Sequence, residues 1–293
     1  MEITYTIEEN NKTIKQILKE RLFISDRLLT FLKKNSLILY NNDKITNLNI
    51  LARLNSTVTV DLNFEEDNNN IVPIKMDLKI IYEDEALLII DKPAGIPVHP
   101  SILHYTNSLS NGVKYYFDSI NLKKKIRPVN RLDRNTSGIV IFAKNQYIQD
   151  CLIHQMQTKE FKKTYLAVVE GHLKKLNGTI DAPITRKENS IIERCVAENG
   201  EKSITHYKVL KQNFEKNYDI VECLLETGRT HQIRVHLSYI GHPLIGDTLY
   251  GNNSKYISRQ ALHAYKVEFI HPITNKLTQF TSDLPKDFVS FII

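Results

Sequence analysis

The residues of this chain with the clearest chemical potential surround one carboxylate, Asp133. It stands between Arg131 and Arg134 and just ahead of residues 136–138, Thr-Ser-Gly, which form a small polar turn before an apolar run. An acid in a sharp turn beside guanidinium groups stays ionised, because opposite charges and hydrogen-bond donors favour the charged form. An ionised aspartate can act as a nucleophile. The competing interpretation is an ordinary turn aspartate that accepts hydrogen bonds from its own backbone.

Four further motifs surround this loop in a fixed order. They are Ile80-Ile81-Tyr82-Glu83-Asp84-Glu85, Asp91-Lys92-Pro93-Ala94-Gly95, Lys163-Thr164-Tyr165 and Thr227-Gly228-Arg229-Thr230-His231-Gln232-Ile233-Arg234. Together with residues 127–140 they resemble the signature motifs of the RluA-type pseudouridine synthases, and the match covers roughly residues 78 to 293. One position departs from the pattern, because many members carry His where this chain has Asn130.

The resemblance implies an isomerase that flips a uridine out of RNA and rejoins its base to the ribose through carbon 5, without a cofactor. Asp133 would be the nucleophile, attacking either the anomeric carbon of the ribose or carbon 6 of the uracil. Tyr165 would stack on the flipped base, and Arg131 would approach the nucleotide or its flanking phosphates. Either Arg234 or Arg229 would pair with Asp133, and helical spacing favours Arg234.

The sequence predicts that these residues are positioned by an α+β fold with a mixed, largely antiparallel sheet. Strands are expected where apolar, β-branched residues run together, at 87–90, 138–142, 164–169 and 218–224. Asn145 is a suitable N-cap for a helix to about residue 160. Thr230 likewise predicts a helix over 231–240, ended by Gly241, with Arg234 and Ile233 on different faces.

The first 64 residues form a separate unit. Helices are predicted at about 13–19 and 25–34, followed by short strands at 36–40 and 56–60, and Ser25 is a plausible N-cap of the second helix. This order, with Arg27 and Lys33-Lys34 on or beside the second helix, resembles the alpha-L RNA-binding motif. The competing interpretation is a helical cap that merely packs on the catalytic domain.

Residues 65–77 are acidic, rich in asparagine and contain a proline, so they are expected to be a linker. The predicted domains are therefore an RNA-binding-like domain at 1–64 and a catalytic domain at 78–293.

The overall composition favours an RNA partner without requiring one. The 39 Lys and Arg against 33 Asp and Glu give a net charge of +6, which moderately favours a polyanionic partner. No apolar run approaches the roughly 20 residues of a membrane span, and the start lacks the pattern of a secretory signal, so a cytoplasmic location is expected. The three cysteines and the spacing of the histidines match no zinc motif, so no metal is expected.

The sequence thus predicts a pseudouridine synthase that acts as a monomer on structured RNA, with ribosomal RNA favoured over transfer RNA. One alternative is a non-catalytic RNA-binding or ribosome-assembly factor of the same fold, which an intact Asp133 and Tyr165 disfavour. Another is a glycoside hydrolase, which normally needs a second carboxylate that no motif here supplies.

Overall fold

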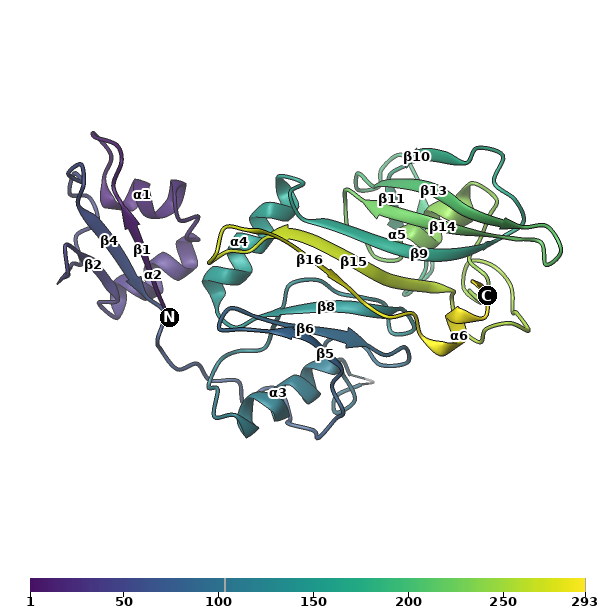
Figure 1. The fold of residues 1–293 in the computed structure, drawn as a ribbon, viewed down its shortest axis with the longest axis horizontal. Coiled ribbons are helices and arrows are strands. Elements are labelled where there is room, and N and C mark those ends of the chain that lie inside the picture. The colour runs from purple at the N-terminus through teal and green to yellow at the C-terminus, as the bar shows by residue number, and fades with distance from the viewer. Residues whose placement is uncertain (103, 293) are drawn as a thin grey trace.

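The structure is a computed structural model that describes residues 1–102 and 104–292. Leu103 and Ile293, both inside the predicted catalytic domain, lie outside the described residues. Figure 1 shows an elongated molecule with a small N-terminal unit at one end and a long central sheet beside it. Among the described residues, no helix combines the length and the apolar character needed to cross a bilayer.

The N-terminal unit packs two helices on one small sheet. Its elements are β1 (Glu2–Thr6), α1 (Ile14–Glu20), α2 (Asp26–Lys34), β2 (Ile38–Tyr40), β3 (Asp43–Lys44) and β4 (Thr57–Asp61). The strands pair antiparallel in the order β1-β4-β2-β3. Thr13 and Ser25 cap the two helices by accepting hydrogen bonds from backbone N–H groups of the first turn, so both predicted helices are confirmed. The sequence did not indicate β1, whose side chains alternate between exposed and half-buried.

The central sheet is mixed and largely antiparallel, as predicted. Its strands run in the order β10-β13-β14-β9-β15-β8-β6-β5, with β16 paired to β15 and β7 paired to β8. They are β5 (Ile80–Glu83), β6 (Leu87–Lys92), β7 (Arg127–Pro128), β8 (Ser137–Ala143), β9 (Lys162–Glu170), β10 (Asn177–Asp181), β13 (Ile204–Asn213), β14 (Tyr218–Leu225), β15 (Leu262–Ile270) and β16 (Leu277–Thr281). The pairing of β15 with β8 is parallel, and the other pairings in this sheet are antiparallel.

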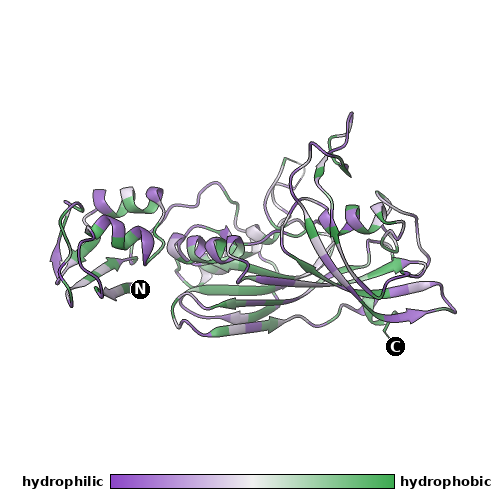
Figure 2. Cartoon of the chain, turned by 90° about the horizontal axis from the view of Figure 1, so that it is seen from above, coloured by the Kyte–Doolittle hydropathy of each residue, from purple (hydrophilic) through white to green (hydrophobic). Residues whose placement is uncertain are grey.

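The strands at the middle of this sheet contain continuous apolar runs because helices cover both faces. Figure 2 shows the matching continuous hydrophobic colour along several strands. Leu87 and Ile89 of β6 share a core with α4 (Gln146–Gln157), whereas Leu88 and Ile90 share a core with α3 (Leu109–Ser119) and α5 (Gln232–Tyr239). Strands buried on both faces lose the usual alternation of polar and apolar residues. The remaining elements are a short hairpin of β11 (Ile184–Arg186) with β12 (Arg194–Val196), and α6 (Lys286–Val289).

Two predicted helices bear on the site, and one of them starts differently from the prediction. Asn145 caps α4 by accepting a hydrogen bond from the N–H of Ile148, as expected. The prediction that Thr230 caps α5 was wrong, because the N-cap is His231, in the left-handed region at φ 60°. The Gln232 side-chain oxygen instead accepts hydrogen bonds from the Arg229 N–H and the Thr227 hydroxyl, at 3.0 and 2.8 Å. A side chain inside the helix thus organises the turn that precedes it.

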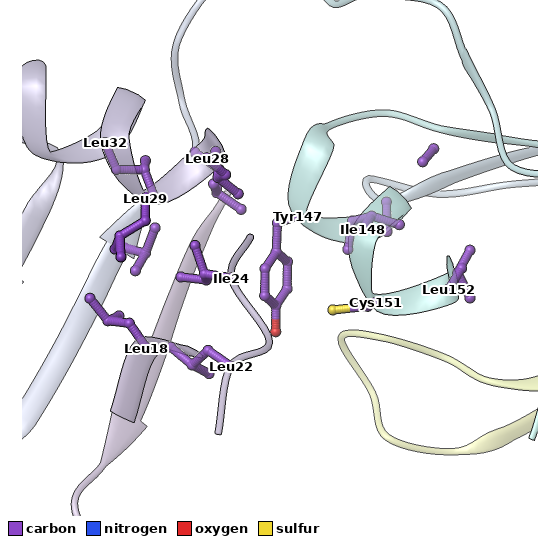
Figure 3. Packing of buried hydrophobic residues seen from close by; sticks show 14 of the residues in the cluster. Leu18, Leu22, Ile24, Leu28, Leu29, Leu32, Tyr147, Ile148, Cys151 and Leu152 are labelled. Carbon is purple, nitrogen blue, oxygen red and sulfur yellow. The ribbon is translucent and has the colours of Figure 1, made fainter. Parts of the chain in front are cut away.

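The N-terminal unit contacts the outer face of α4 through apolar side chains. Tyr147 and Ile148 of α4 belong to the same buried cluster as Leu18, Leu22 and Ile24. Figure 3 shows the Tyr147 ring between the side chains of the N-terminal unit and the rest of α4. The Phe23 ring stacks on His154 of the same helix, with ring centroids 4.3 Å apart. Helix α4 therefore lies between the small unit and the central sheet.

The segment 65–77 contains no helix or strand, but contacts with the catalytic domain hold it at several points along its length. Glu66 forms an ion pair with Arg127, and its N–H donates to the carbonyl of Lys123 at 2.9 Å. Ile71 is buried in the core under α3, and the N–H of Ile74 donates to the carbonyl of Asn111. The segment thus follows the surface of the central sheet's domain.

Candidate active site

Asp133 lies in the loop that leads into β8, where the backbone is tightly constrained. The N–H of Thr136 donates to the Asp133 carbonyl at 3.1 Å and closes a turn. Two residues further on, Gly138 has φ 111°, and a Cβ atom there would lie 2.2 Å from the carbonyl oxygen of Ala264. Only glycine fits this position, because both the backbone angle and the contact with β15 exclude a side chain. The close approach of β15 to β8 thus fixes the point at which the Asp133 loop ends and β8 begins.

Arg234 on α5 connects Asp133 to a second carboxylate. Its Nη1 atom donates to Asp133 Oδ2 at 3.1 Å, while its Nε and Nη2 atoms donate to the two oxygens of Asp247 at 2.7 and 2.8 Å. Asp247 is 1% exposed. Burial opposes the charge on Arg234, but the hydrogen bonds and negative charges of Asp247 and Asp133 together outweigh it and raise the pKa of the guanidinium. Bidentate pairing also fixes the plane of the group, so one of its N–H bonds stays aimed at Asp133.

Arg229 takes a different partner. Its side chain is exposed at the surface, where Nη1 lies 2.5 Å from Glu201 Oε2, and its Nε atom is 3.4 Å from the Lys202 carbonyl. Of the two arginines considered from the sequence, Arg234 is the one that contacts Asp133. The reason is positional, since Arg229 lies in the turn before α5 whereas Arg234 lies within the buried face of that helix.

Tyr165 on β9 lies near Asp133 and is buried at 7% exposure. Burial raises the pKa of its phenol, and the negative charge of Asp133 raises it further. The ring therefore carries a neutral hydroxyl at physiological pH. A neutral aromatic ring beside the Asp133 carboxylate offers a stacking surface for a base and an apolar boundary that limits access of water.

Two buried basic side chains hold the Asp133 loop by donating hydrogen bonds to carbonyl groups. Lys92 Nζ donates to the carbonyls of Pro93, Ile96 and Arg134 at 2.9, 2.9 and 3.1 Å. Burial lowers the pKa of Lys92 to about 7, with Arg259 adding to the effect. Arg259 Nη1 donates to the Asn135 carbonyl at 3.1 Å. Lys92 comes before the Asp133 turn in the sequence and Arg259 comes after it, and both hold the backbone of that turn.

A layer of aromatic and imidazole groups lies behind the arginine. The Arg234 guanidinium lies over the Tyr250 ring, 5.0 Å from its centroid, and the Tyr250 hydroxyl is 2.8 Å from His231 Nδ1. His231 Nε2 is 3.9 Å from Asp133 Oδ2. Burial lowers the pKa of His231, more than the neighbouring carboxylates raise it, so the imidazole is neutral near pH 7.

Sequence reasoning missed several of these supporting residues. Lys92 lies inside the motif Asp91-Lys92-Pro93-Ala94-Gly95, but the sequence analysis assigned it no role. Asp247, Tyr250 and Arg259 gave no signal of their own, because their roles depend on contacts with residues far away in the chain.

The comparisons with known proteins identify the family of this chain. The sequence matches the family described as RNA pseudouridylate synthase over residues 86–239. It is 38% identical over 287 residues to the Uncharacterized RNA pseudouridine synthase YhcT of Bacillus subtilis (strain 168), covering 98% of this chain and 94% of that protein. It is 37% identical over 244 residues to the Ribosomal large subunit pseudouridine synthase D of Zymomonas mobilis, covering 78% and 76%. This chain belongs to the RNA pseudouridine synthase family.

The solved structures agree with this family membership. The structure of Human RNA Pseudouridylate Synthase Domain Containing 1 has a TM-score of 0.59 and 27% sequence identity, and the match covers 71% of this chain and 84% of that one. Together with the RluA-type motifs, these relatives make the chain an isomerase that converts uridine in RNA to pseudouridine.

Two other residues of the pseudouridine synthase motif lie beside the site. Arg131 is exposed and close enough to His99 that its charge, after burial, helps to lower the imidazole pKa. Asn130, which replaces the histidine of many family members, is buried. Its amide donates to the Ile139 carbonyl and accepts from the Ile141 N–H, both at 2.9 Å, so it extends the hydrogen bonding of β8. Among the described residues, neither Arg131 nor Asn130 forms a hydrogen bond or an ion pair with Asp133, Tyr165 or Arg234.

Proposed function

We propose that this enzyme isomerises specific uridines in structured RNA with Asp133 as the nucleophile. The observation that carries the proposal is the chain of contacts from Asp133 through Arg234 to Asp247. A guanidinium held on its far side by a buried carboxylate fixes the orientation of the attacking carboxylate. An unshared carboxylate oxygen on Asp133, which is 24% exposed, can then reach a base that enters from solvent.

The reaction conserves all atoms and needs no redox step. Asp133 attacks either the anomeric carbon of the ribose or carbon 6 of the uracil, and the bond between uracil nitrogen 1 and the ribose breaks. The base turns, carbon 5 bonds to the anomeric carbon, and the proton leaves carbon 5 as the aspartate is released. Tyr165 stacks on the base throughout, and its hydroxyl assists the removal of the proton from carbon 5. Arg131 binds the backbone phosphates of the flipped nucleotide. No cofactor or metal takes part in this scheme.

The RNA that we favour is ribosomal. A relative that shares 37% identity is named for the large ribosomal subunit. We further propose that residues 1–64 form an RNA-binding domain, joined by 65–77 to a catalytic domain at 78–293. Arg27, Lys33 and Lys34 are exposed on α2, where they can contact phosphates. We propose that the enzyme acts in the cytoplasm, where ribosomal RNA is processed, and as a monomer, because one chain brings together all the proposed site residues.

Tritium release from RNA labelled at carbon 5 of uridine tests this proposal. The wild-type protein and Asp133→Ala are compared on ribosomal and transfer RNA pools, with Asp118→Ala on the surface of α3 as the control. We expect release by the wild type and the control from ribosomal RNA and none by Asp133→Ala, which should still bind RNA. Release by Asp133→Ala would refute the assignment of the nucleophile. Release from transfer RNA alone would refute the ribosomal target, and binding without release from either pool would favour a non-catalytic RNA-binding factor.

A further inference from the structure

The hydroxyl group of Tyr250 determines which ring nitrogen of His231 carries the proton. Its oxygen accepts a hydrogen bond from the backbone N–H of Arg194 at 2.8 Å, and it lies 2.8 Å from His231 Nδ1. Burial raises the pKa of the phenol, which keeps its proton, and lowers the pKa of the imidazole, which is neutral. A backbone N–H can only donate, so within the described chain Nδ1 is the acceptor for the phenolic proton. This network assigns the proton of the imidazole to Nε2.

The Nε2–H group of His231 faces the catalytic carboxylate without bonding to it. Nε2 is 3.9 Å from Asp133 Oδ2, beyond hydrogen-bond length, and that oxygen already accepts a hydrogen bond from Arg234. The His231 side chain is 12% exposed, and Nε2 is not one of the fully buried polar atoms that lack a partner in the described part of the chain. Nε2 is therefore accessible to a ligand. A hydrogen-bond donor next to the nucleophile is left for the substrate.

The backbone of His231 is consistent with a role in the site rather than in the helix. His231 is the N-cap of α5, but its side chain makes no capping hydrogen bond and its backbone is left-handed at φ 60°. N-cap residues usually accept a hydrogen bond from the first turn through a side-chain oxygen. Left-handed residues other than glycine are uncommon, and they cluster at functional sites. The imidazole instead lies between the hydroxyl of Tyr250 and the carboxylate of Asp133.

We propose that the Nε2–H group of His231 donates a hydrogen bond to a carbonyl oxygen of the flipped uracil. Negative charge develops on these oxygens whether the base leaves the ribose or Asp133 adds to carbon 6. A neutral donor that is already in place binds the oxygen more strongly as this charge grows, and it transfers no proton. His231 is thus a further catalytic residue, and Tyr250 is a positioning residue that acts through the imidazole. The inference rests on the proposed function and adds to it a donor that recognises the uracil.

Nitrogen-15 NMR of histidine-labelled protein tests the position of the proton without any substrate. Ring nitrogens with and without a proton have well-separated chemical shifts, and the His231 signals are those absent from His231→Gln. In the wild type at neutral pH we expect a protonated Nε2 and an unprotonated Nδ1. Tyr250→Phe removes the phenolic proton and should lower the fraction of this tautomer. A proton on Nδ1 in the wild type would overturn the inference.

Single-turnover tritium release from ribosomal RNA compares His231→Met with His231→Gln. Both side chains are unbranched and face the same left-handed backbone, but only glutamine supplies an N–H donor. We expect His231→Met to slow the chemical step by about 100-fold or more, and His231→Gln to lie within about tenfold of the wild type. RNA affinity from fluorescence anisotropy should be the same for both, and near-ultraviolet circular dichroism checks their folding. Equal rates of the two folded variants would overturn the inference.

RNA transcribed with 2-thiouridine or 4-thiouridine identifies the carbonyl oxygen, because sulfur is a weak hydrogen-bond acceptor. Sulfur at the bonded position should slow the wild type more than it slows His231→Met, whereas equal effects on both proteins at both positions would overturn the inference. Asp133→Ala is assayed in parallel to separate the two proposals. Release by Asp133→Ala refutes the proposed nucleophile. Equal rates of the two His231 variants, with no release by Asp133→Ala, refute the role of His231 and leave the proposed function standing.

Discussion

The Asp133 cluster and the contact of the N-terminal unit with α4 both join segments that are distant in the sequence, but by different forces. In the first, Arg234 connects Asp133 and Asp247 through three directed hydrogen bonds between charged groups. In the second, the Tyr147 ring packs among leucine and isoleucine side chains of the N-terminal unit (Figure 3). Charged hydrogen bonds have strict geometry, whereas apolar packing depends on buried area and shape.

This difference fits what each region must do. A nucleophile has to be held in one orientation, and only directed bonds from a rigid group can impose it. A contact between two structural units needs cohesion, which apolar area supplies without fixing any single atom. The site is therefore expected to be sensitive to changes of one functional group, and the contact with α4 to changes of volume.

The largest expected effect is on stability, from removal of the central cation. Arg234→Met leaves Asp247 buried without its counter-charge, which typically costs about 3 to 5 kcal/mol. Urea unfolding measures this loss. Arg229→Met is the matched control, because the Arg229 pair with Glu201 is exposed and should contribute less than about 0.5 kcal/mol. Equal effects of the two substitutions would mean that the buried network does not stabilise the site.

The apolar contact should respond to loss of volume. Tyr147→Ala removes a buried ring from the cluster between α4 and the N-terminal unit, and we expect the free energy of unfolding to fall by about 3 kcal/mol. Limited proteolysis should cut residues 65–77 faster in this variant, as the N-terminal unit detaches. Unchanged proteolysis would indicate that the remaining contacts, such as Phe23 on His154, hold the unit in place.

Loss of a tyrosine hydroxyl should slow the reaction at the Asp133 site but not at the contact between α4 and the N-terminal unit. Tyr165→Phe keeps the stacking ring but removes the hydroxyl beside Asp133, and a hydroxyl that assists proton transfer at carbon 5 contributes roughly 100-fold or more to the rate. Single-turnover tritium release measures the rate of the chemical step. Tyr147→Phe is the matched control, and its rate should equal that of the wild type. Full activity of Tyr165→Phe would limit this residue to stacking.

The smallest effect concerns the lysine that holds the catalytic turn. Burial lowers the pKa of Lys92 from 10.5 to about 7, so between these values the unfolded chain carries a proton that the folded chain lacks. Wild-type stability relative to Lys92→Met should therefore rise with pH above 7, by up to about 1.4 kcal/mol per pH unit. Urea unfolding at pH 7, 8 and 9 measures this slope. The exposed Lys216, replaced by Met, is the control, and a flat difference for Lys92→Met would show that the buried ammonium keeps its proton.

Local patterns in the sequence were sufficient to predict the family and most elements near the site. The motif around Asp133, the strand holding Tyr165 and the caps at Ser25 and Asn145 depend on neighbouring residues, and the structure contains each of them. The start of α5 could not be predicted in the same way. Its turn is closed by the side chain of Gln232, and Thr230 offers the more familiar capping signal.

The tertiary structure alone decided which groups meet. The sequence by itself determined that an ionised aspartate, an aromatic residue and nearby arginines were available for isomerase chemistry. Helical spacing favoured Arg234 over Arg229 as the partner of Asp133, but only the fold brought the two groups into contact and supplied Asp247 to hold the arginine. The contact between Asp133 and Arg234 spans 101 residues of the chain, and such a contact follows from the packing of the whole sheet and its helices rather than from any local pattern.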